Sequence, residues 1–249
     1  MDKAGRAVLR VDGFVMRRCI TAIMAALCMM CAVPAHAAMR GYIVTSFETI
    51  RVEAPVRIIL TTGSGVSAMG EGERDVLDRV NLSVSGGVLT VTMDEKSASG
   101  FADTKQSPAP LLMLSTGQLR RATVIGGGGL IIKELAGLEA DVALNGSGEI
   151  VIESADVERL SLFIGGSGRV TAKGKARDVQ ATVNGSGTLD AQELGARAAV
   201  VTNAGSGSIR LMVHGPVRGA SSGSGDVTIS GKPICTISQN GVGTIQCAP

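Results

Sequence analysis

Apolar and polar residues recur with a fixed period over about the last hundred residues of the chain. The recurring unit contains a Gly-X-Gly tripeptide, and an aliphatic residue stands three positions after the central residue of each copy. Neighbouring centres are 20, 19, 20, 18 and 18 residues apart. Such a period is typical of repeat architectures in which each unit is one turn of a coil stacked on the previous turn. The six centres are Ser147, Ser167, Ser186, Ser206, Ser224 and Val242.

Four columns of apolar residues flank these centres. Positions three and five after each centre are mostly apolar, and so are positions five and seven before the later ones. Because side chains alternate between the two faces of a strand, both members of each pair share one face. Each turn therefore supplies at least two strands to one interior, and the pattern predicts an all-β, single-stranded β-helix with coils of about 18–20 residues. The column three positions after the centres contains Ile150, Val170, Leu189, Ile209, Val227 and Ile245.

The paired glycines are predicted to form the corners of this coil. A coil of this size must turn sharply, and glycine accepts the positive φ that corners often need. Asn145, Asn184 and Asn240 stand just before a corner glycine, where we expect their side chains to bond the neighbouring coil. An aromatic content of 2%, without tryptophan, favours a narrow β-helix over a β-sandwich. The predicted corner residues are Gly146, Gly148, Gly166, Gly168, Gly185, Gly187, Gly205, Gly207, Gly223, Gly225, Gly241 and Gly243.

The N-terminal half of the chain is less regular. Residues 47–52 alternate between apolar and polar, and residues 56–60 lead into another Gly-Ser-Gly. Residues 80–91 alternate again around Gly86-Gly87, which predicts a hairpin or a further corner. Residues 96–110, with Ser, Lys, Asp and Pro, are predicted to form an exposed loop.

The run of four glycines at 126–129 resembles the later corners. With Gly128 as its centre, this corner lies 19 residues before Ser147. We therefore divide the chain after the leader into an N-terminal β part at 38–125 and regular β-helix repeats at 126–249. No helix longer than a turn or two is expected.

Residues 1–37 have the pattern of a signal peptide. Arg17 and Arg18 precede the apolar run 19–33, and Ala35-His36-Ala37 supplies the small-x-small pattern of a cleavage site. The sequence thus predicts cleavage after Ala37, with either Met1 or Met16 as the true start; a buried N-terminal helix is the alternative. The run is shorter than the about 20 residues of a membrane span. No second such run follows, so we expect no integral membrane segment after cleavage.

Cleavage after Ala37 changes the charge balance of the chain. It removes five of the 24 basic residues and two of the 22 acidic residues, which leaves a net charge of −1. Nucleic-acid-binding domains normally carry a clustered positive charge. We therefore expect no nucleic-acid partner.

The chain resembles the head GIN domain family, whose members are described as bacterial autotransporter-adhesin head domains. The resemblance rests on Phe47-Glu48-Thr49-Ile50-Arg51-Val52, on the segment 78–91 with Gly86-Gly87, and on the serial Gly-Ser-Gly corners, and it covers residues 44–247. It implies an all-β fold built on a right-handed β-helix, and it implies no catalytic residues.

Catalytic patterns are weak in this sequence. His214 is the one histidine that remains after cleavage. Residues 219–223 match the Gly-X-Ser-X-Gly elbow around Ser221, but that motif requires a strand-turn-helix context with the histidine downstream. His214 precedes Ser221 and no helix is predicted after it, so we expect no catalytic residues.

Metal and cofactor patterns are weak as well. Asp226 follows Gly223-Ser224-Gly225, but the same position in the other coils lacks an acidic ladder for calcium. Two cysteines and one histidine fall short of a zinc site. The glycines at 126–129 continue into a strand rather than the helix of a dinucleotide-binding loop. No metal and no cofactor is expected.

Cys235 and Cys247 are the two cysteines outside the leader, and both fall in inward-facing columns of the last coil. An even number of cysteines in an exported protein predicts a disulfide. Such a bond would close the terminal coil, whose outer edge has no neighbour. Two buried free thiols are the alternative.

The sequence thus predicts an exported, non-enzymatic protein of the bacterial cell envelope or surface, either periplasmic or extracellular. Its role would be adhesin-like binding or structural, with an envelope polysaccharide or another surface protein as the partner. A carbohydrate-active β-helix enzyme of the lyase or hydrolase type is the alternative, because such enzymes use the same fold. A passive scaffold is the third possibility.

Overall fold

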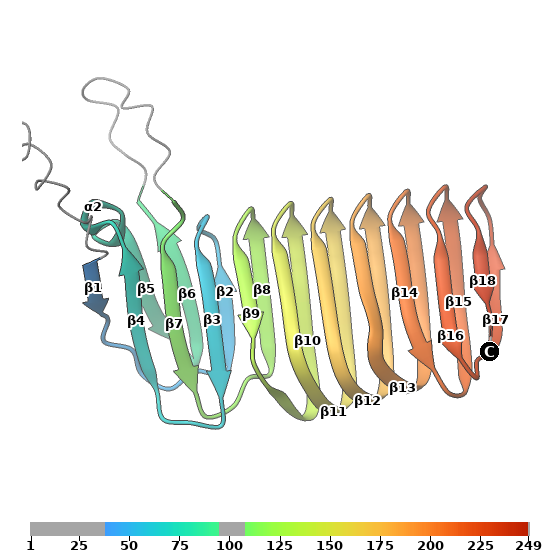
Figure 1. Ribbon diagram of the computed structural model, residues 1–249, viewed down its shortest axis with the longest axis horizontal. Helices are drawn as coiled ribbons and strands as arrows, with labels where there is room; N and C mark the ends of the chain where they lie inside the picture. Colours follow the sequence, from blue (N-terminus) through green and yellow to red (C-terminus); the bar gives the residue numbers. More distant parts are fainter. Residues whose placement is uncertain (1–37, 95–107, 249) are drawn as a thin grey trace, which may run out of the picture. The chain divides into compact units, whose positions relative to one another are not determined.

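The computed structural model describes residues 38–94 and 108–248. The predicted signal peptide at 1–37, with its cleavage site after Ala37, lies outside the described residues, as does most of the predicted loop at 96–110. The described residues form a β-solenoid of about six turns, as the period of the sequence predicts (Figure 1).

In the C-terminal part, the strands of each coil pair in parallel with the matching strands of the next coil (Figure 1). Ile150 pairs with Val170, and the same column continues in register to Ile245. The predicted stacking of the aliphatic column is therefore confirmed. These strands are β10 (Leu135–Gly146), β11 (Glu149–Gly166), β12 (Arg169–Gly185), β13 (Thr188–Gly205), β14 (Ser208–Val213), β15 (Pro216–Gly223), β16 (Val227–Gly231), β17 (Ile234–Gln239) and β18 (Ile245–Cys247).

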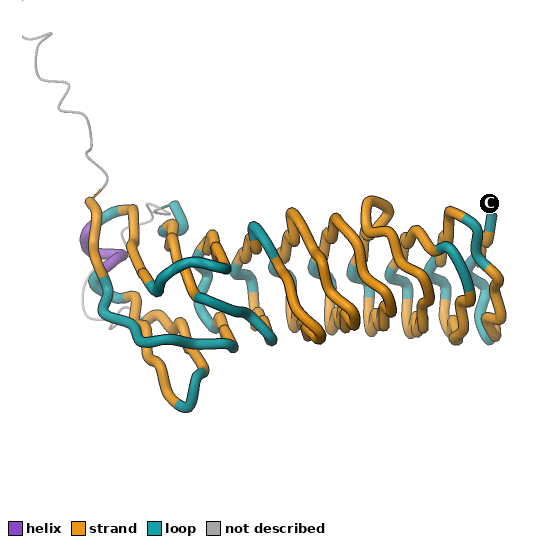
Figure 2. The backbone as a smooth tube through the Cα atoms, turned by 90° about the horizontal axis from the view of Figure 1, so that it is seen from below, coloured by secondary structure: helices purple, strands orange, loops and turns teal. Residues whose placement is uncertain are grey.

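The interior of the coil is a single continuous apolar core. Side chains from both long faces of each coil meet inside, and Ile150, Val170, Leu189 and Ile209 are completely buried. Burial of a side chain of this size stabilises a fold by about 1.5–3 kcal/mol. Because each coil covers the apolar edge of the previous one, the core extends along the solenoid axis. Figure 2 shows the backbone of the coils following one another along this axis.

The N-terminal strands stack out of sequence order. Strand β2 (Thr49–Val52) pairs in parallel with β6 (Val88–Met93) on one side and with β8 (Arg121–Gly126) on the other. The turn that holds β2 is therefore inserted between two later turns (Figure 1). The second strand of this turn, β3 (Arg57–Thr62), lies in the same way between β7 (Leu111–Thr116) and β9 (Gly129–Ile132).

Antiparallel strands finish the sheet at its N-terminal end. Strand β5 (Val80–Ser85) forms a hairpin with β6, with Gly86 and Gly87 at φ 58° and 77° in the turn. Of the two interpretations of this segment, the structure has the hairpin. Strand β4 (Ser67–Gly72) pairs antiparallel with β7 and with β1 (Ala38–Gly41), and the single-turn helix α2 (Arg74–Leu77) follows β4.

The corner at 126–129 has its central residue one position earlier in the chain than the sequence pattern predicted. Gly126 pairs with Gly146, so the residue that matches Ser147 is Gly127 and not Gly128. The spacing to the next centre is thus 20 residues. Residues 125 and 126 stand on either side of the division predicted between the N-terminal part and the repeats. In the structure both belong to β8 and pair without a break with Asn145 and Gly146 of β10.

None of the helices in residues 38–94 and 108–248 has the length and hydropathy of a membrane span.

Candidate functional site

The Gly-Ser-Gly corners stack so closely that their backbones bond one another. The backbone N–H groups of Ser147 and Gly148 both donate to the carbonyl oxygen of Gly126, and the same arrangement recurs in later coils. At the first glycine of a corner the chain adopts positive φ, for example +121° at Gly185. A Cβ there would also lie 2.5 Å from the carbonyl oxygen of Gly166 in the previous coil.

At the second glycine of each corner, the neighbouring coil leaves no room for a side chain. Gly168 has no positive φ, but a Cβ on it would lie 2.5 Å from the Gly148 carbonyl oxygen and 2.5 Å from Cδ2 of Leu144. Cβ atoms do not approach backbone this closely, so the site excludes any side chain. The corners are therefore filled by neighbouring backbone and leave no loop that could cradle a ligand.

The side chains that hydrogen-bond to corner backbones are Asn203 and Gln239, rather than the three asparagines expected from the sequence. Within residues 38–94 and 108–248, the bonds between successive corners come from backbone N–H groups and not from Asn145, Asn184 or Asn240. The expected role of these three exposed asparagines is wrong because the stacked backbones already satisfy one another. Instead Asn203 donates from Nδ2 to the carbonyl oxygen of Gly207 at 2.9 Å. Gln239 donates in the same way to Gly243.

Asn203 belongs to an inward-facing column that the sequence pattern did not reveal. The column lies three positions before each centre, where Ile164 and Val183 precede Asn203, and Ser221 follows it. Asn203 and Ser221 are buried, and Oδ1 of Asn203 has no hydrogen-bond partner among the described residues. Period 2 from the apolar columns would have identified this position, but its residues change from aliphatic to polar toward the C-terminus.

The histidine and serine of the elbow-like motif lie in different environments. Ser221 is 3% exposed in the interior column, whereas His214 is exposed on the outside of the coil. The structure therefore does not bring them together as a nucleophile and its base. No cluster of three or more metal-ligating side chains occurs in the described part of the chain.

Asp226 has a structural partner in the next coil. Its Oδ1 accepts hydrogen bonds from the hydroxyl of Thr244 and, at 3.0 Å, from the Thr244 backbone N–H. The bond from the hydroxyl, and then the bond from the backbone, lower the pKa of the Asp226 carboxyl below its usual value. Hydrogen bonds to the charged form have this effect.

Thr244→Val is expected to raise the pKa of Asp226 toward its usual value of about 3.9, because the variant keeps the N–H but loses the hydroxyl. With its folded-state pKa lowered, Asp226 stabilises the fold above the unfolded-state value, and this contribution is lost as the pH falls through the folded-state value. Titration of the Asp226 carboxyl by NMR checks the shift. Thr188→Val is the control, since its neighbours in the same column are Arg169 and Ser208. An unchanged Asp226 pKa in Thr244→Val contradicts the assignment.

The outer face carries rows of charged residues in which the sign alternates from coil to coil. One row runs through Lys133, Glu153, Lys173 and Glu193. Lys133 lies 2.8 Å from Glu153, and Lys173 lies 2.9 Å from Glu193, whose hydrogen bond and charge raise the pKa of Lys173. Solvent screens exposed pairs of this kind, so each of them contributes little to stability. The row therefore contributes mainly to register between coils.

Each coil also turns on the side opposite to its Gly-Ser-Gly corner. A groove opens along these opposite turns, and we call it the corner groove. It has a volume of about 490 Å³ and crosses four consecutive coils. The inward-facing Ala176 and Ala196, together with Gly195, form part of its floor. Its charged lining consists of Asp156, Glu158, Lys175, Arg177 and Arg197, and the His214 side chain also lines it.

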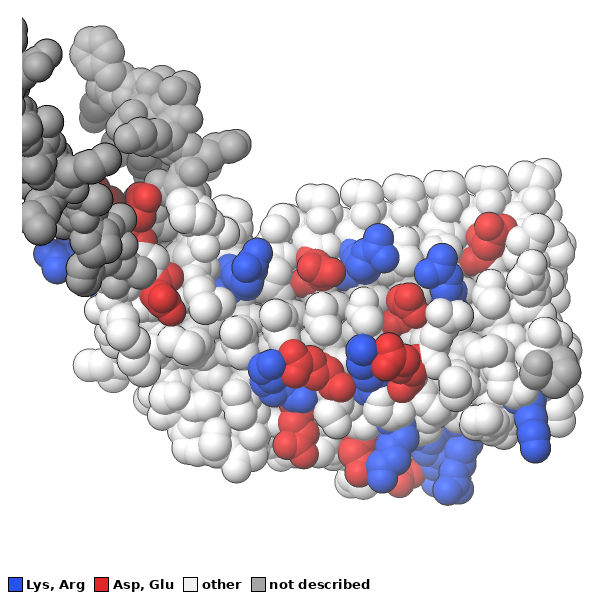
Figure 3. Space-filling model, in the orientation of Figure 1, with Lys and Arg blue, Asp and Glu red and all other residues white. Residues whose placement is uncertain are grey.

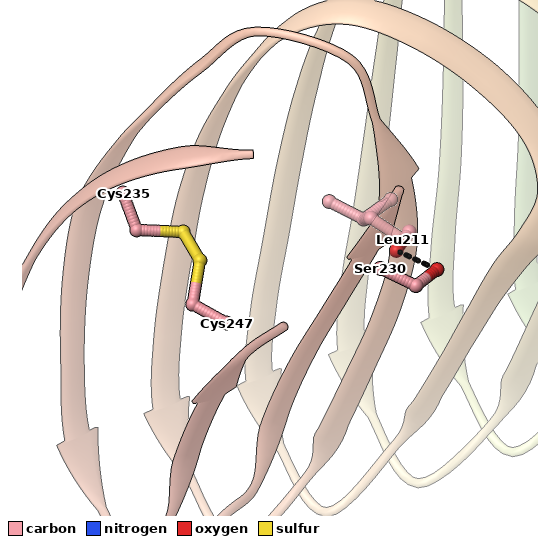
Figure 4. Close-up of a disulfide and its surroundings, with 4 residues drawn as sticks. All are labelled: Leu211, Ser230, Cys235 and Cys247. Carbon is pink, nitrogen blue, oxygen red and sulfur yellow. Dashed lines mark hydrogen bonds between the residues drawn. A yellow bond between two sulfur atoms is a disulfide. The ribbon is translucent and has the colours of Figure 1, made fainter. Parts of the chain in front are cut away.

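The last coil is closed by a disulfide between Cys235 and Cys247 (Figure 4). Cys235 pairs in register with Val217, and Cys247 with Ile229, so both continue inward-facing columns. Cys235 is half-buried and Cys247 is exposed, because no further coil within the described residues covers them. The bond therefore lies across the open end of the core.

Several solved structures have this fold. An adhesin-like protein from Bacteroides fragilis ("putative adhesin") is 22% identical with a TM-score of 0.74, over 85% of this chain and 97% of that one. A "putative lipid binding protein" from Parabacteroides distasonis is 18% identical with a TM-score of 0.66, over 86% and 97%. A "putative adhesin" from Parabacteroides merdae is 17% identical with a TM-score of 0.65, over 86% and 96%.

The family comparison agrees with the fold. No curated protein matches the chain. The family model described as "Putative auto-transporter adhesin, head GIN domain" matches residues 46–233, which is most of the β-solenoid. The stacked glycine corners, the parallel coils and this match together establish that the chain belongs to the head GIN domain family.

Proposed function

We propose that this protein is an exported, adhesin-like binding module of the bacterial cell envelope that acts without catalysis. Membership of the head GIN domain family supports an adhesin-like role at a surface. The observation that carries the proposal is the corner groove, which presents charged side chains from four consecutive coils along one side of a rigid, fully packed solenoid.

The chemistry of the corner groove favours binding over catalysis. Its two carboxylates are engaged in ion pairs, since Asp156 lies 3.1 Å from Lys175 and Glu158 lies 3.4 Å from Arg177. A polysaccharide-cleaving enzyme needs a free acid or base positioned at the scissile bond. A carboxylate that is engaged with a neighbouring cation of the protein is not a free group in this position.

The proposal is tested with protein purified from an exporting host against peptidoglycan, envelope polysaccharides, lipid vesicles and whole bacterial cells. The name of the Parabacteroides distasonis relative is the reason to include lipid. We expect saturable binding to one class of surface without release of any product. Product release would favour the carbohydrate-active enzyme, and no binding at all would favour a passive scaffold. Fractionation of a tagged copy determines whether the protein is periplasmic or extracellular.

A further inference from the structure

The register of the strands aligns one exposed residue from each of five consecutive coils. Val157 pairs with Ala176, Ala176 with Ala196, Ala196 with Val213, and Val213 with Gly231. The residue that follows each of these positions points outward beside the corner groove. We call these residues the corner row: Glu158, Arg177, Arg197, His214 and Lys232.

The sign of the charge does not alternate along the corner row. Glu158 at its start pairs with Arg177. Among the described residues, the next three members, Arg197, His214 and Lys232, have no ion-pair partner, although all three are exposed. Backbone hydrogen bonds to the previous coil hold two of these residues in place. The His214 N–H donates to the Ala196 carbonyl oxygen at 2.8 Å, and the Lys232 N–H donates to the Val213 carbonyl oxygen at 3.0 Å.

This arrangement differs from the other charged rows of the solenoid. The row through Lys133 and Glu193 alternates in sign, and Asp190 faces Arg210 in the same way. Neighbouring coils are about 4.8 Å apart, so like charges in one row repel one another. Figure 3 shows the same polarity along the lower edge, with acidic side chains in the middle and basic ones toward the C-terminal end. The corner row thus provides positive charge that a ligand with repeated negative charges would neutralise.

We propose that the corner row and the corner groove bind a linear anionic polysaccharide of the uronic acid type, and this inference rests on the binding function proposed above. A polyuronate carries a carboxylate on every sugar, so that its charges can face successive coils. Arg197 donates paired N–H groups to one carboxylate, as a guanidinium commonly does. The sugar rings lie along the groove between the exposed side chains of Lys175, Arg177 and Arg197.

The composition of the groove distinguishes a polysaccharide from a nucleic acid. Single-stranded nucleic acids are bound by aromatic side chains on which the bases stack. None of the residues that line the corner groove is aromatic apart from the His214 imidazole. The exposed part of the lining is mainly charged, with Asp156, Glu158, Lys175, Arg177 and Arg197, so it offers ion pairs and hydrogen bonds rather than flat rings on which bases could stack.

The test measures binding of polygalacturonate to the purified full-length protein by calorimetry. Its fully methyl-esterified form is the uncharged matched probe. The variant R197Q/K232Q removes one Arg and one Lys from the corner row, and K173Q/R210Q removes one of each from alternating rows. We expect R197Q/K232Q to weaken binding about tenfold, because each exposed charge contact contributes a few-fold in affinity. K173Q/R210Q is expected to bind like the unmodified protein, and added salt to weaken binding.

Three outcomes would overturn the inference: equal affinity for the esterified polymer, equal losses in both variants, or tighter binding of a single-stranded oligonucleotide than of polygalacturonate. Circular dichroism and thermal unfolding of both variants confirm that they are folded. Failure of polygalacturonate to bind while the protein still binds cells or another envelope component overturns this inference alone. Failure to bind anything in the wider panel overturns the proposed function as well.

Discussion

Replacement of Gly185 by alanine is expected to lower the free energy of unfolding by at least about 3 kcal/mol. The residue has φ +121°, a conformation that side chains with a Cβ rarely adopt, and the added Cβ would lie 2.5 Å from the carbonyl oxygen of Gly166. Backbone atoms cannot move away without separating two coils that share hydrogen bonds. Denaturant unfolding followed by far-UV circular dichroism measures the loss.

Gly195→Ala is the matched control for this experiment. Gly195 lies in the next coil without positive φ, and the nearest atom to a Cβ there is the Gly174 carbonyl oxygen at 3.9 Å. A Gly→Ala change at a compatible position alters stability by about 1 kcal/mol or less, often favourably. If the two variants lost the same stability, the corner glycines would not have the structural role that we assign to them.

Loss of the Cys235–Cys247 disulfide is expected to destabilise the last coil by about 3 kcal/mol, because the bond closes a loop with a sequence separation of 12 residues. The effect should be local, since each coil of a solenoid contacts only its neighbours. In the variant C235S/C247S we expect faster hydrogen exchange at the amides of β17. The amides of β11, four coils away from the end, are the internal reference.

The bond itself can be checked by mass spectrometry of the purified, exported protein. Reduction should add the mass of two hydrogen atoms to the intact chain. An unchanged mass would show two free thiols and would contradict the disulfide. Unchanged exchange in β17 of C235S/C247S would show instead that the bond exists without stabilising the open end.

The sequence predicted the C-terminal coils well because their geometry depends on local patterns. A period near 19 residues, together with alternation at period 2, is enough to align Ile150 with Val170 in neighbouring coils. The requirement for glycine at the corners follows from the same pattern. The disulfide pairing followed from there being two cysteines outside the leader, both in inward-facing columns of one coil.

Other features depend on contacts that a local pattern does not contain. Nothing in residues 49–62 indicates that their turn lies between two later turns, because the neighbours of a strand are determined by the whole topology. The one-residue error at Gly127 arose because four consecutive glycines allow two alignments. The corner row was missed because its basic residues are separated by 20, 17 and 18 positions in a chain with nearly balanced charge.

The inserted turn at β2 and β3 has a consequence for the order in which the chain can fold. During synthesis, domains generally fold from the N-terminus as the chain emerges. Strand β2 has both of its neighbours only after β8 at 121–126 has been made, and β3 only after β9 at 129–132. We therefore expect the first half of the protein to assemble in one cooperative step, and each later coil to add to a template that already exists.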